Sequence, residues 1–195
     1  MSKRVVVIHG HPDPSGGHFG TALAEAYVQG AVDQSHEVQV IDVAQLEFPL
    51  LRTKQEFESG PVPESIRQSQ LVIRWAQHLV IIFPLWLGTM PALLKGFLEQ
   101  IFRPGFAVGI GAPARSGKRP LSGKTARLVV TMGMPAFVYR WYFRAHGIRS
   151  LERGVLGFCG IGPIKESLIG GIESPDSTKR SEWLNRMREL GRKGG

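Results

Sequence analysis

The sequence predicts an α/β protein built on a doubly wound, five-stranded parallel sheet with helices on both faces. Short apolar segments rich in β-branched residues alternate along the chain with segments whose apolar residues repeat at helical spacing. This alternation is typical of consecutive β-α-β units, whose right-handed connections bring the strands side by side in parallel. Glycine- and proline-rich loops follow the ends of several strands. Because open α/β sheets bind ligands beyond the carboxyl ends of their strands, these loops are the expected binding region.

The amino-terminal half of the chain predicts the first two strands and the helices that follow them. Residues 5–8 form an uninterrupted apolar run, as expected of a strand that is buried on both faces. A glycine-rich loop separates this run from a helix whose apolar residues recur at helical spacing. The predicted elements are, in order, a strand at 3–9, a helix at 21–32, a strand at 37–43, an irregular segment at 44–63 with a short helix at 54–58, and a helix at 64–77.

The middle of the chain predicts a strand, an exposed apolar turn and a helix. The run at 79–83 is short and apolar, and Pro84 ends it. Pro91 suits the first position of a helix, where its missing N–H costs nothing, and a helix is predicted at 92–102. The side chain of Trp86, in the turn between them, either contacts a flat apolar ligand or packs under a neighbouring loop. The sequence leaves both possibilities open.

The carboxyl-terminal half predicts two further strands, a long loop and a closing helix. The predicted elements are a loop at 103–123, a strand at 126–131, an aromatic and basic segment at 136–146, a helix at 150–159, a strand at 163–170, a helix at 176–191 and a frayed tail at 191–195. The stretch Ser-Gly-Lys-Thr at 122–125 is not a P-loop, because Lys118 stands where that motif requires glycine. Loops as long as 103–123 are usually functional or disordered.

The composition indicates a single domain covering residues 1–195. A hydrophobic content of 43% is enough for a full core. The single cysteine, Cys159, excludes a disulfide framework and a cysteine-rich metal site, and it indicates a reducing compartment. The sequence shows no signal peptide, and no segment approaches the roughly 20 apolar residues of a membrane span. A cytoplasmic protein is therefore expected.

The net charge of +8 is concentrated in one part of the chain. Residues 100–151 contain no Asp or Glu, and they hold nine of the 24 basic residues. A local basic field raises the concentration of anionic ligands near it. The candidate ligands are a phosphorylated cofactor, a nucleic acid and an anionic membrane surface, and the alternative is a solvated basic face without a partner.

The loop at 10–20 is the first candidate binding site. Free backbone N–H groups and the positive end of the helix dipole meet where this loop enters the following helix, which favours an anion. The GxGxxG motif of dinucleotide sites is absent, so the loop suits a single phosphate better than a pyrophosphate. His9 and His11 have the spacing of some metal ligands. Without a nearby Cys, or an acidic residue beyond Asp13, a metal site is not expected.

Three motifs together carry a family resemblance. They are Gly10-His11-Pro12 followed by His18-Phe19, the block FPLWLGTMPALLKGFLEQIFRPGFA at 83–107, and VTMG at 130–133. With these motifs the chain resembles the NAD(P)H:quinone oxidoreductases, a family of flavodoxin-like fold that also includes flavin-binding accessory subunits of potassium efflux systems. The resemblance covers about residues 4–190, and the central block is its most specific part.

The resemblance implies a non-covalently bound flavin as the cofactor. FMN is favoured over FAD, because the loop at 10–20 offers one anion site and no adenine site is evident, and NADPH or NADH is the implied co-substrate. The residues that match the family's flavin contacts are His11, His18 and Phe19 at the phosphate, Pro84, Leu85, Trp86 and Leu87 along the isoalloxazine ring, and Thr131, Met132 and Gly133 in a second turn against that ring. At 18–20 the family commonly has Ser-Phe-Asn, whereas this chain has His-Phe-Gly.

Catalytic roles are implied in the same way. Tyr139 and His146 match the family's Tyr and His near the pyrimidine edge of the flavin and the substrate, and Tyr142 is an alternative for the first role. His146 is expected to donate a proton to a quinone oxygen, or else to make a structural hydrogen bond at a helix end.

Substrate contacts are expected from the segment after the central helix. Phe106 is expected to wall the pocket. Arg115, Lys118 and Arg119 are expected to pair with the 2′-phosphate of the nicotinamide cofactor, which would favour NADPH over NADH.

The predicted function is that of a flavin-dependent NAD(P)H oxidoreductase, which reduces the flavin and then a quinone or similar acceptor in a ping-pong cycle. The alternative is a flavin-binding accessory or regulatory subunit of a membrane transport system, whose basic segment would face the transporter or an anionic bilayer. The resemblance implies a homodimer, because family members complete the active site across a two-fold interface. No recognised nucleic-acid-binding module is present in the sequence, so no nucleic-acid partner is expected.

Overall fold

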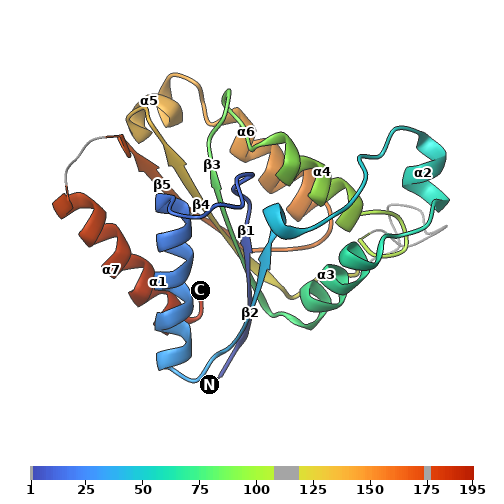
Figure 1. Ribbon diagram of the computed structural model, residues 1–195, viewed down its shortest axis with the longest axis horizontal. Helices are drawn as coiled ribbons and strands as arrows, with labels where there is room; N and C mark the ends of the chain where they lie inside the picture. The colour runs from blue at the N-terminus through green and yellow to red at the C-terminus, as the bar shows by residue number, and fades with distance from the viewer. Residues whose placement is uncertain (1, 108–118, 174–176) are drawn as a thin grey trace.

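The computed structural model describes residues 2–107, 119–173 and 177–195, and it confirms the predicted α/β architecture. One sheet holds five parallel strands in the order β2-β1-β3-β4-β5, with helices on both faces (Figure 1). The strands are β1 (Arg4–His9), β2 (Glu37–Asp42), β3 (His78–Pro84), β4 (Thr125–Met132) and β5 (Ile164–Gly170). In this register His9 lies opposite Asp42 on one side and Ile82 on the other.

The helices divide between the two faces of the sheet, with α1 and α7 on one face and α3 and α4 on the other (Figure 1). The helices are α1 (Phe19–Asp33), α2 (Lys54–Ser59), α3 (Glu64–Trp75), α4 (Ala92–Ile101), α5 (Ala136–Trp141), α6 (His146–Arg149) and α7 (Ser177–Lys193), with a 3-10 turn η1 (Val43–Gln45). The predicted helix at 150–159 is a π-helix, η2 (Ser150–Gly157). None of the helices in the described ranges has the length and apolar character needed to cross a bilayer.

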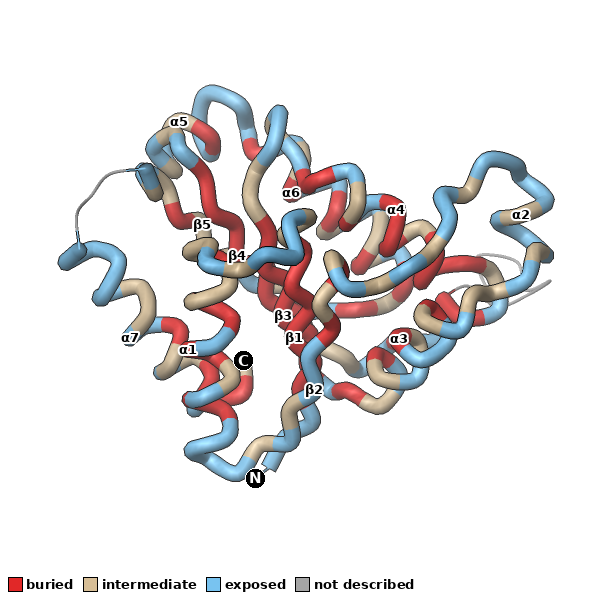
Figure 2. The backbone as a smooth tube through the Cα atoms, viewed as in Figure 1, coloured by how far each residue is buried: buried red, intermediate tan, exposed pale blue. Residues whose placement is uncertain are grey.

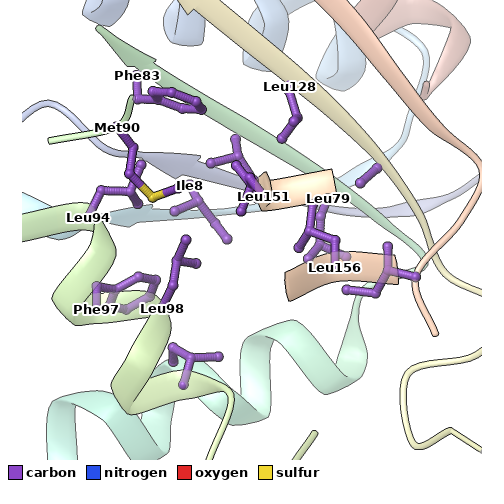
Figure 3. Packing of buried hydrophobic residues seen from close by; sticks show 14 of the residues in the cluster. Ile8, Leu79, Phe83, Met90, Leu94, Phe97, Leu98, Leu128, Leu151 and Leu156 are labelled. Carbon is purple, nitrogen blue, oxygen red and sulfur yellow. The ribbon is translucent and has the colours of Figure 1, made fainter. Parts of the chain in front are cut away.

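Successive side chains of the strands point into two separate apolar cores. Val7 packs with Tyr27 and Met187 beneath α1 and α7. The next residue, Ile8, points to the opposite face and packs with Leu94 and other residues of α4 and η2 (Figure 3). The inner strands are therefore buried on both faces (Figure 2), which explains why their sequences are continuous apolar runs.

Two arginines of the acid-free stretch are structural and do not contribute to a basic surface. Arg103 is 3% exposed and donates hydrogen bonds to backbone carbonyl oxygens of residues 56, 57, 60 and 61, around the end of α2. Arg127 in β4 is also buried and donates to Ser167 Oγ in β5 at 3.0 Å. The first residue of the predicted long loop thus fixes a neighbouring segment.

The prediction of a frayed tail at 191–195 is wrong. Helix α7 continues through Lys193, and Lys3 Nζ donates to the carbonyl oxygen of Gly194 at 3.0 Å. Gly191 lies so close to the carbonyl oxygen of Tyr27 that a Cβ at this position would overlap it. The close packing of α1 against α7 therefore keeps the end of the chain in place.

Candidate functional site

Three connections meet at the carboxyl edge of the sheet and form the candidate site. They are the loop at 10–18 after β1, the turn at 85–91 after β3 and the segment at 133–135 after β4 (Figure 1). The N–H of Gly10 donates to the carbonyl oxygen of Ile82 at 2.8 Å, and the N–H of Leu85 donates to that of Thr131 at 2.7 Å. These two bonds tie each loop to the neighbouring strand.

The turn after β3 is a tight hairpin with two left-handed residues. Trp86 and Thr89 exchange backbone hydrogen bonds of 2.9 and 3.0 Å. Between them, Leu87 and Gly88 have φ angles of 47° and 81°, as a type I′ turn requires. Because the left-handed conformation costs a residue with a Cβ roughly 1–2 kcal/mol, the turn needs support from outside.

The two helices that follow β4, α5 and α6, supply this support. Tyr139 Oη donates to the carbonyl oxygen of Gly88 at 2.9 Å. Gly147 lies so close to the same carbonyl oxygen that a Cβ would overlap it. With its backbone held in this way, the turn leaves Trp86 50% exposed and Leu87 fully exposed. No loop of the described chain buries Trp86, so its face remains accessible to a flat apolar ligand.

Three imidazole rings are stacked at the end of β1 and in the loop that follows it. The rings of His11 and His18 are 3.7 Å apart and inclined by 17°, and the rings of His9 and His11 are 6.2 Å apart and inclined by 15°. His18 Nε2 lies 2.8 Å from Asp13 Oδ2. Asp13 also accepts the N–H of Ser15 at 2.9 Å, and these hydrogen bonds lower the pKa of Asp13 to about 2. Asp13 is therefore ionised at neutral pH beside His18.

His11 is held in its neutral form, with a defined tautomer. Its Nδ1 accepts the backbone N–H of Asp13 at 3.2 Å, so the proton of the neutral ring is on Nε2. Burial, together with the charges that His18 and His9 can carry, lowers the pKa of His11. The described residues contain no group of three or more His, Cys, Asp or Glu that could hold a metal ion. The Nε2–H of His11 is a hydrogen-bond donor suited to an anion, because Nδ1 of the same ring is already occupied.

The start of α1 fits a phosphate group. His18 occupies the N-cap position without making a side-chain cap, so the N–H groups of Phe19, Gly20 and Thr21 have no partner within the helix. Two buried polar atoms beside them, His9 Nε2 and Thr21 Oγ1, have no hydrogen-bond partner among the described residues. Backbone donors, the helix dipole and these two atoms together form an anion site.

The second turn contributes backbone only. The side chains of Thr131 and Met132 are buried, and the carbonyl oxygen of Thr131 already accepts the N–H of Leu85. Gly133 is exposed, and a Cβ at this position would come within 2.7 Å of Glu173 Oε1. A ring that approaches this turn would therefore contact the backbone of Gly133, which lacks a side chain that would block it.

The structure separates the two predicted catalytic residues. Tyr139 is 1% exposed, its hydroxyl donates to the carbonyl oxygen of Gly88, and burial raises its pKa, so within this subunit the hydroxyl is not presented to a substrate. Tyr142 is 80% exposed. His146 begins α6 with an exposed side chain, directly before the Gly147 that contacts the turn. His146 is thus beside the site, whereas Tyr139 positions the turn.

Phe106 and Arg119, which were predicted to contact the substrate, lie away from the three connections of the site in this subunit. Phe106 is buried under the guanidinium of Arg74, at 5.2 Å, near the end of α3. Arg119 Nη1 donates to the carbonyl oxygen of Gly157 at 2.7 Å, just before β5. Both lie at the amino edge of the sheet, because connections from a helix to the next parallel strand return to that edge. The predicted residues Arg115 and Lys118 lie outside the described residues.

An apolar groove runs from the turn along α4 and η2. Its first part has a volume of about 440 Å³ and its second part about 380 Å³. Lys95 of α4 and Val155 of η2 line both parts. Other lining residues are Trp86, Leu87, Met90 and Leu151 in the first part, and Leu98, Phe102, Phe158 and Cys159 in the second. The groove connects the exposed turn to a long apolar surface.

Four residues of the site were missed as functional candidates by sequence reasoning. They are His9 and Asp13, which were considered only as metal ligands, together with Thr21 and Asp42. A usable signal was present for Thr21, because a hydroxyl residue in the first turn of a helix after a glycine-rich loop suits a phosphate. No local signal existed for Asp42, which reaches His9 only through the pairing of β2 with β1.

Comparisons with known proteins agree with this architecture. The chain is 28% identical to a ribosyldihydronicotinamide dehydrogenase-like protein of Penicillium crustosum, over 96% of this chain and 80% of that protein. It is 27% identical to an uncharacterized NAD(P)H oxidoreductase of Haemophilus influenzae, over 92% and 89%. The solved structure of an NAD(P)H:quinone oxidoreductase from Methanothermobacter marburgensis superposes with a TM-score of 0.81 at 25% identity, covering 98% of this chain and 96% of that one.

A family model described as flavodoxin-like fold matches residues 3–190. The match spans all five strands and the three connections of the candidate site. This chain therefore belongs to the family of flavodoxin-like fold proteins, as its motifs at 10–20, 83–107 and 130–133 predicted.

Proposed function

We propose that this protein is an oxidoreductase that receives a hydride from NAD(P)H on bound FMN and then reduces a quinone or similar acceptor in a ping-pong cycle. One observation carries the proposal: the anion site and the apolar turn are contiguous, with the rings of His11 and Trp86 6.2 Å apart. FMN has the same layout, with a phosphate at one end and a flat ring system at the other. The relatives named as NAD(P)H oxidoreductases support this assignment.

The anion site determines the choice of flavin in this proposal. The start of α1, with His18 and Thr21, offers donors for one phosphate group. The pyrophosphate of FAD would need a second set of donors, and its adenine a further pocket. His11 would donate its Nε2–H to the phosphate, since its Nδ1 is occupied by the N–H of Asp13. FMN is therefore the proposed cofactor.

The turn and the segment after β4 would serve the ring end of the flavin. When bound, the flavin supplies the atom that accepts and releases the hydride, and its reduced form carries negative charge. Trp86 and Leu87 would cover the ring and exclude water, with the turn held in place by Tyr139. His146 would donate a proton to the oxygen of the acceptor.

A second copy of the chain is the proposed cover of the apolar groove. Its two parts expose apolar side chains, among them Leu87 and Phe158, which a partner subunit would remove from water. In a two-fold dimer the basic loop at 115–119 of one subunit would serve the site of the other, which would give the preference for NADPH.

Sedimentation velocity tests the dimer. Phe158→Asp is expected to shift the protein to the monomer, because the charge would be buried in the interface. Leu71→Asp is the matched control, since Leu71 is an exposed leucine on α3, outside the residues that line the groove. A Phe158→Asp variant that sediments like the unmodified protein would contradict the proposed interface.

A second candidate function is that of a flavin-binding subunit that docks on a membrane transporter. The observation that favours it is the exposed aromatic surface of α5 and its flank, with Phe137, Trp141 and Tyr142 each more than half exposed. Its expected signature is a cation flux in membrane vesicles that rises when the purified protein is added. Substitution of these aromatics would remove the flux and leave the redox activity of the isolated protein.

The experiment that tests the proposed function is the visible spectrum of the purified protein before and after addition of NADPH under anaerobic conditions. We expect a flavin spectrum that NADPH bleaches and that a quinone restores, and release of FMN, identified by its mass. A protein that contains no flavin and cannot be reconstituted with FMN or FAD would refute the proposal.

A further inference from the structure

A buried histidine lies beneath the proposed phosphate site, and sequence reasoning gave it no function. His9 ends β1, is only 6% exposed and has a carboxylate on one side, with Asp42 Oδ1 3.4 Å from its Nδ1. Asp42 comes from the end of β2 and also accepts the N–H of Ala44 at 3.2 Å, which orients it. The pair resembles the arrangement in which a carboxylate holds one nitrogen of an imidazole while the other nitrogen remains available.

The available nitrogen of His9 points toward the start of α1. Its Nε2 is the nearest atom, at 3.7 Å, to the position where a Cβ of Gly20 would lie, and Gly20 is in the first turn of α1. The same Nε2 is buried and has no hydrogen-bond partner among the described residues. A buried nitrogen without a hydrogen-bond partner destabilises the folded protein unless a ligand supplies the missing hydrogen bond. Here the residue in position 20 is glycine, so no side chain stands between the nitrogen and the helix terminus.

Without a ligand, Nε2 of His9 lies in a desolvated place near positive charge. The nitrogen is desolvated, it faces the positive end of the α1 dipole, and His11 and His18 are stacked beyond it. From α7, Arg180 lies over the ring of Phe19, at 5.5 Å, and adds positive charge at the same helix end.

Two carboxylates of the described chain add negative charge near the stacked imidazole rings. Asp42 faces Nδ1 of His9 directly, whereas Asp13 faces His18 at 2.8 Å and offsets any charge on that ring. From β3, the residue opposite His9 in the register is the apolar Ile82. His9 is consequently the imidazole of the stack whose second nitrogen is buried without a hydrogen-bond partner among the described residues.

We propose that His9, oriented by Asp42, takes up a proton from solvent when a phosphate dianion binds at the start of α1, so that cofactor affinity depends on pH. This inference rests on the proposed flavin function. A phosphate reverses the balance of charge at the helix terminus, because its two negative charges favour a protonated Nε2. The bound proton lets Nε2 donate a hydrogen bond to a phosphate oxygen.

The sign of the pH dependence follows from linkage. Binding that is accompanied by uptake of one proton weakens as pH rises. The affinity falls by up to about tenfold per pH unit, over the range between the pKa of the protonated group in the free protein and its pKa in the complex. Riboflavin has the same ring system without the phosphate, so its affinity should not show this dependence.

Calorimetric titration of the flavin-free protein with FMN tests the inference. The measurement is made at about pH 7.5, where free FMN is dianionic because the second phosphate pKa is near 6, in buffers of different ionisation enthalpy. The dependence of the observed enthalpy on the buffer gives the number of protons taken up. We expect a net proton uptake with FMN and none with riboflavin. The His9→Gln variant should still bind FMN, but more weakly and without the proton uptake.

Two further variants test whether the proton is taken up by His9. Asp42→Asn keeps a polar group beside His9 and removes its charge, and we expect it to reduce the uptake. His36→Gln is the matched control, because His36 lies at the far end of the sheet, where its ring bonds the N–H of Lys3 and the carbonyl of Arg192. This control is expected to leave the uptake unchanged.

The outcomes distinguish the inference from the function on which it rests. FMN binding with no net proton uptake, or uptake that persists in His9→Gln and disappears in His18→Gln, would overturn the role of His9 and leave the flavin function intact. Absence of FMN binding by the unmodified protein at every pH would refute both.

Discussion

The hydroxyl of Tyr139 should stabilise the turn that carries Trp86 and Leu87. The substitution Tyr139→Phe keeps the buried ring and removes one hydrogen bond of 2.9 Å to the carbonyl oxygen of Gly88. Such a bond contributes about 1 kcal/mol net, and because Gly88 is partly exposed, water can replace the lost donor. We therefore expect the free energy of unfolding to fall by about 1 kcal/mol, which lowers the Tm by roughly 2–4 °C for a domain of this size.

The same substitution distinguishes a positioning role from a catalytic one. Burial raises the pKa of Tyr139, so its hydroxyl remains protonated over the pH range of an activity assay. If Tyr139 only positions the turn, Tyr139→Phe should weaken FMN binding and change kcat by less than about tenfold. General acid catalysis typically contributes 10²–10⁴-fold, so its loss would be much larger.

Thermal denaturation, FMN titration and single-turnover kinetics measure these three effects. Tyr142→Phe is the matched control, since Tyr142 is exposed and should leave Tm and FMN affinity unchanged. A hundredfold fall in kcat for Tyr139→Phe with an unchanged Tm would refute the positioning role and reinstate Tyr139 as the catalytic acid.

Three further substitutions test other parts of the structure. Gly147→Ala should destabilise the protein by more than about 2 kcal/mol in urea denaturation, because its Cβ would overlap the carbonyl oxygen of Gly88; an unaffected midpoint would contradict the described contact. Arg103→Met should expose the segment around α2 to limited proteolysis, because the carbonyl oxygens of residues 56, 57, 60 and 61 lose the donor that they share; a protected segment would contradict this role. Glu152 has its pKa raised to about 7 by burial and by the charge of Glu166, so ionisation disfavours the folded state, and stability is lost as pH rises from about 4.5 through 7. In Glu152→Gln, Tm should therefore fall less over this pH range. The difference in the free energy of unfolding should be at most about 1 kcal/mol, since the side chain is partly exposed. A pH profile of Tm identical to that of the unmodified protein would contradict the raised pKa of Glu152.

The sequence by itself determined the elements of this protein and their order. Strand β3 and helix α4 are predicted by local patterns alone, because an apolar run, a proline at each end of the turn and helical periodicity are properties of neighbouring residues. The sequence also predicted the edge of the sheet at which the ligand loops lie, since the loops after parallel strands meet at the carboxyl edge. The exposure of Trp86 was one of two possibilities that the sequence left open.

Tertiary structure decided which side chains meet at that edge. The pairing of β2 with β1 brings Asp42 to His9, 33 residues away in the chain, and no local pattern encodes this contact. The direction of α5 buries Tyr139 and exposes Tyr142, although the two residues are in the same aromatic segment. Phe106 was expected at the site because its motif is contiguous with the turn, and Arg119 because it lies in the acid-free loop that follows, but α4 carries the chain to the opposite edge. Local periodicity is set by neighbouring residues, whereas the contacts of a site depend on strand register and helix direction, which the packing of the whole chain determines.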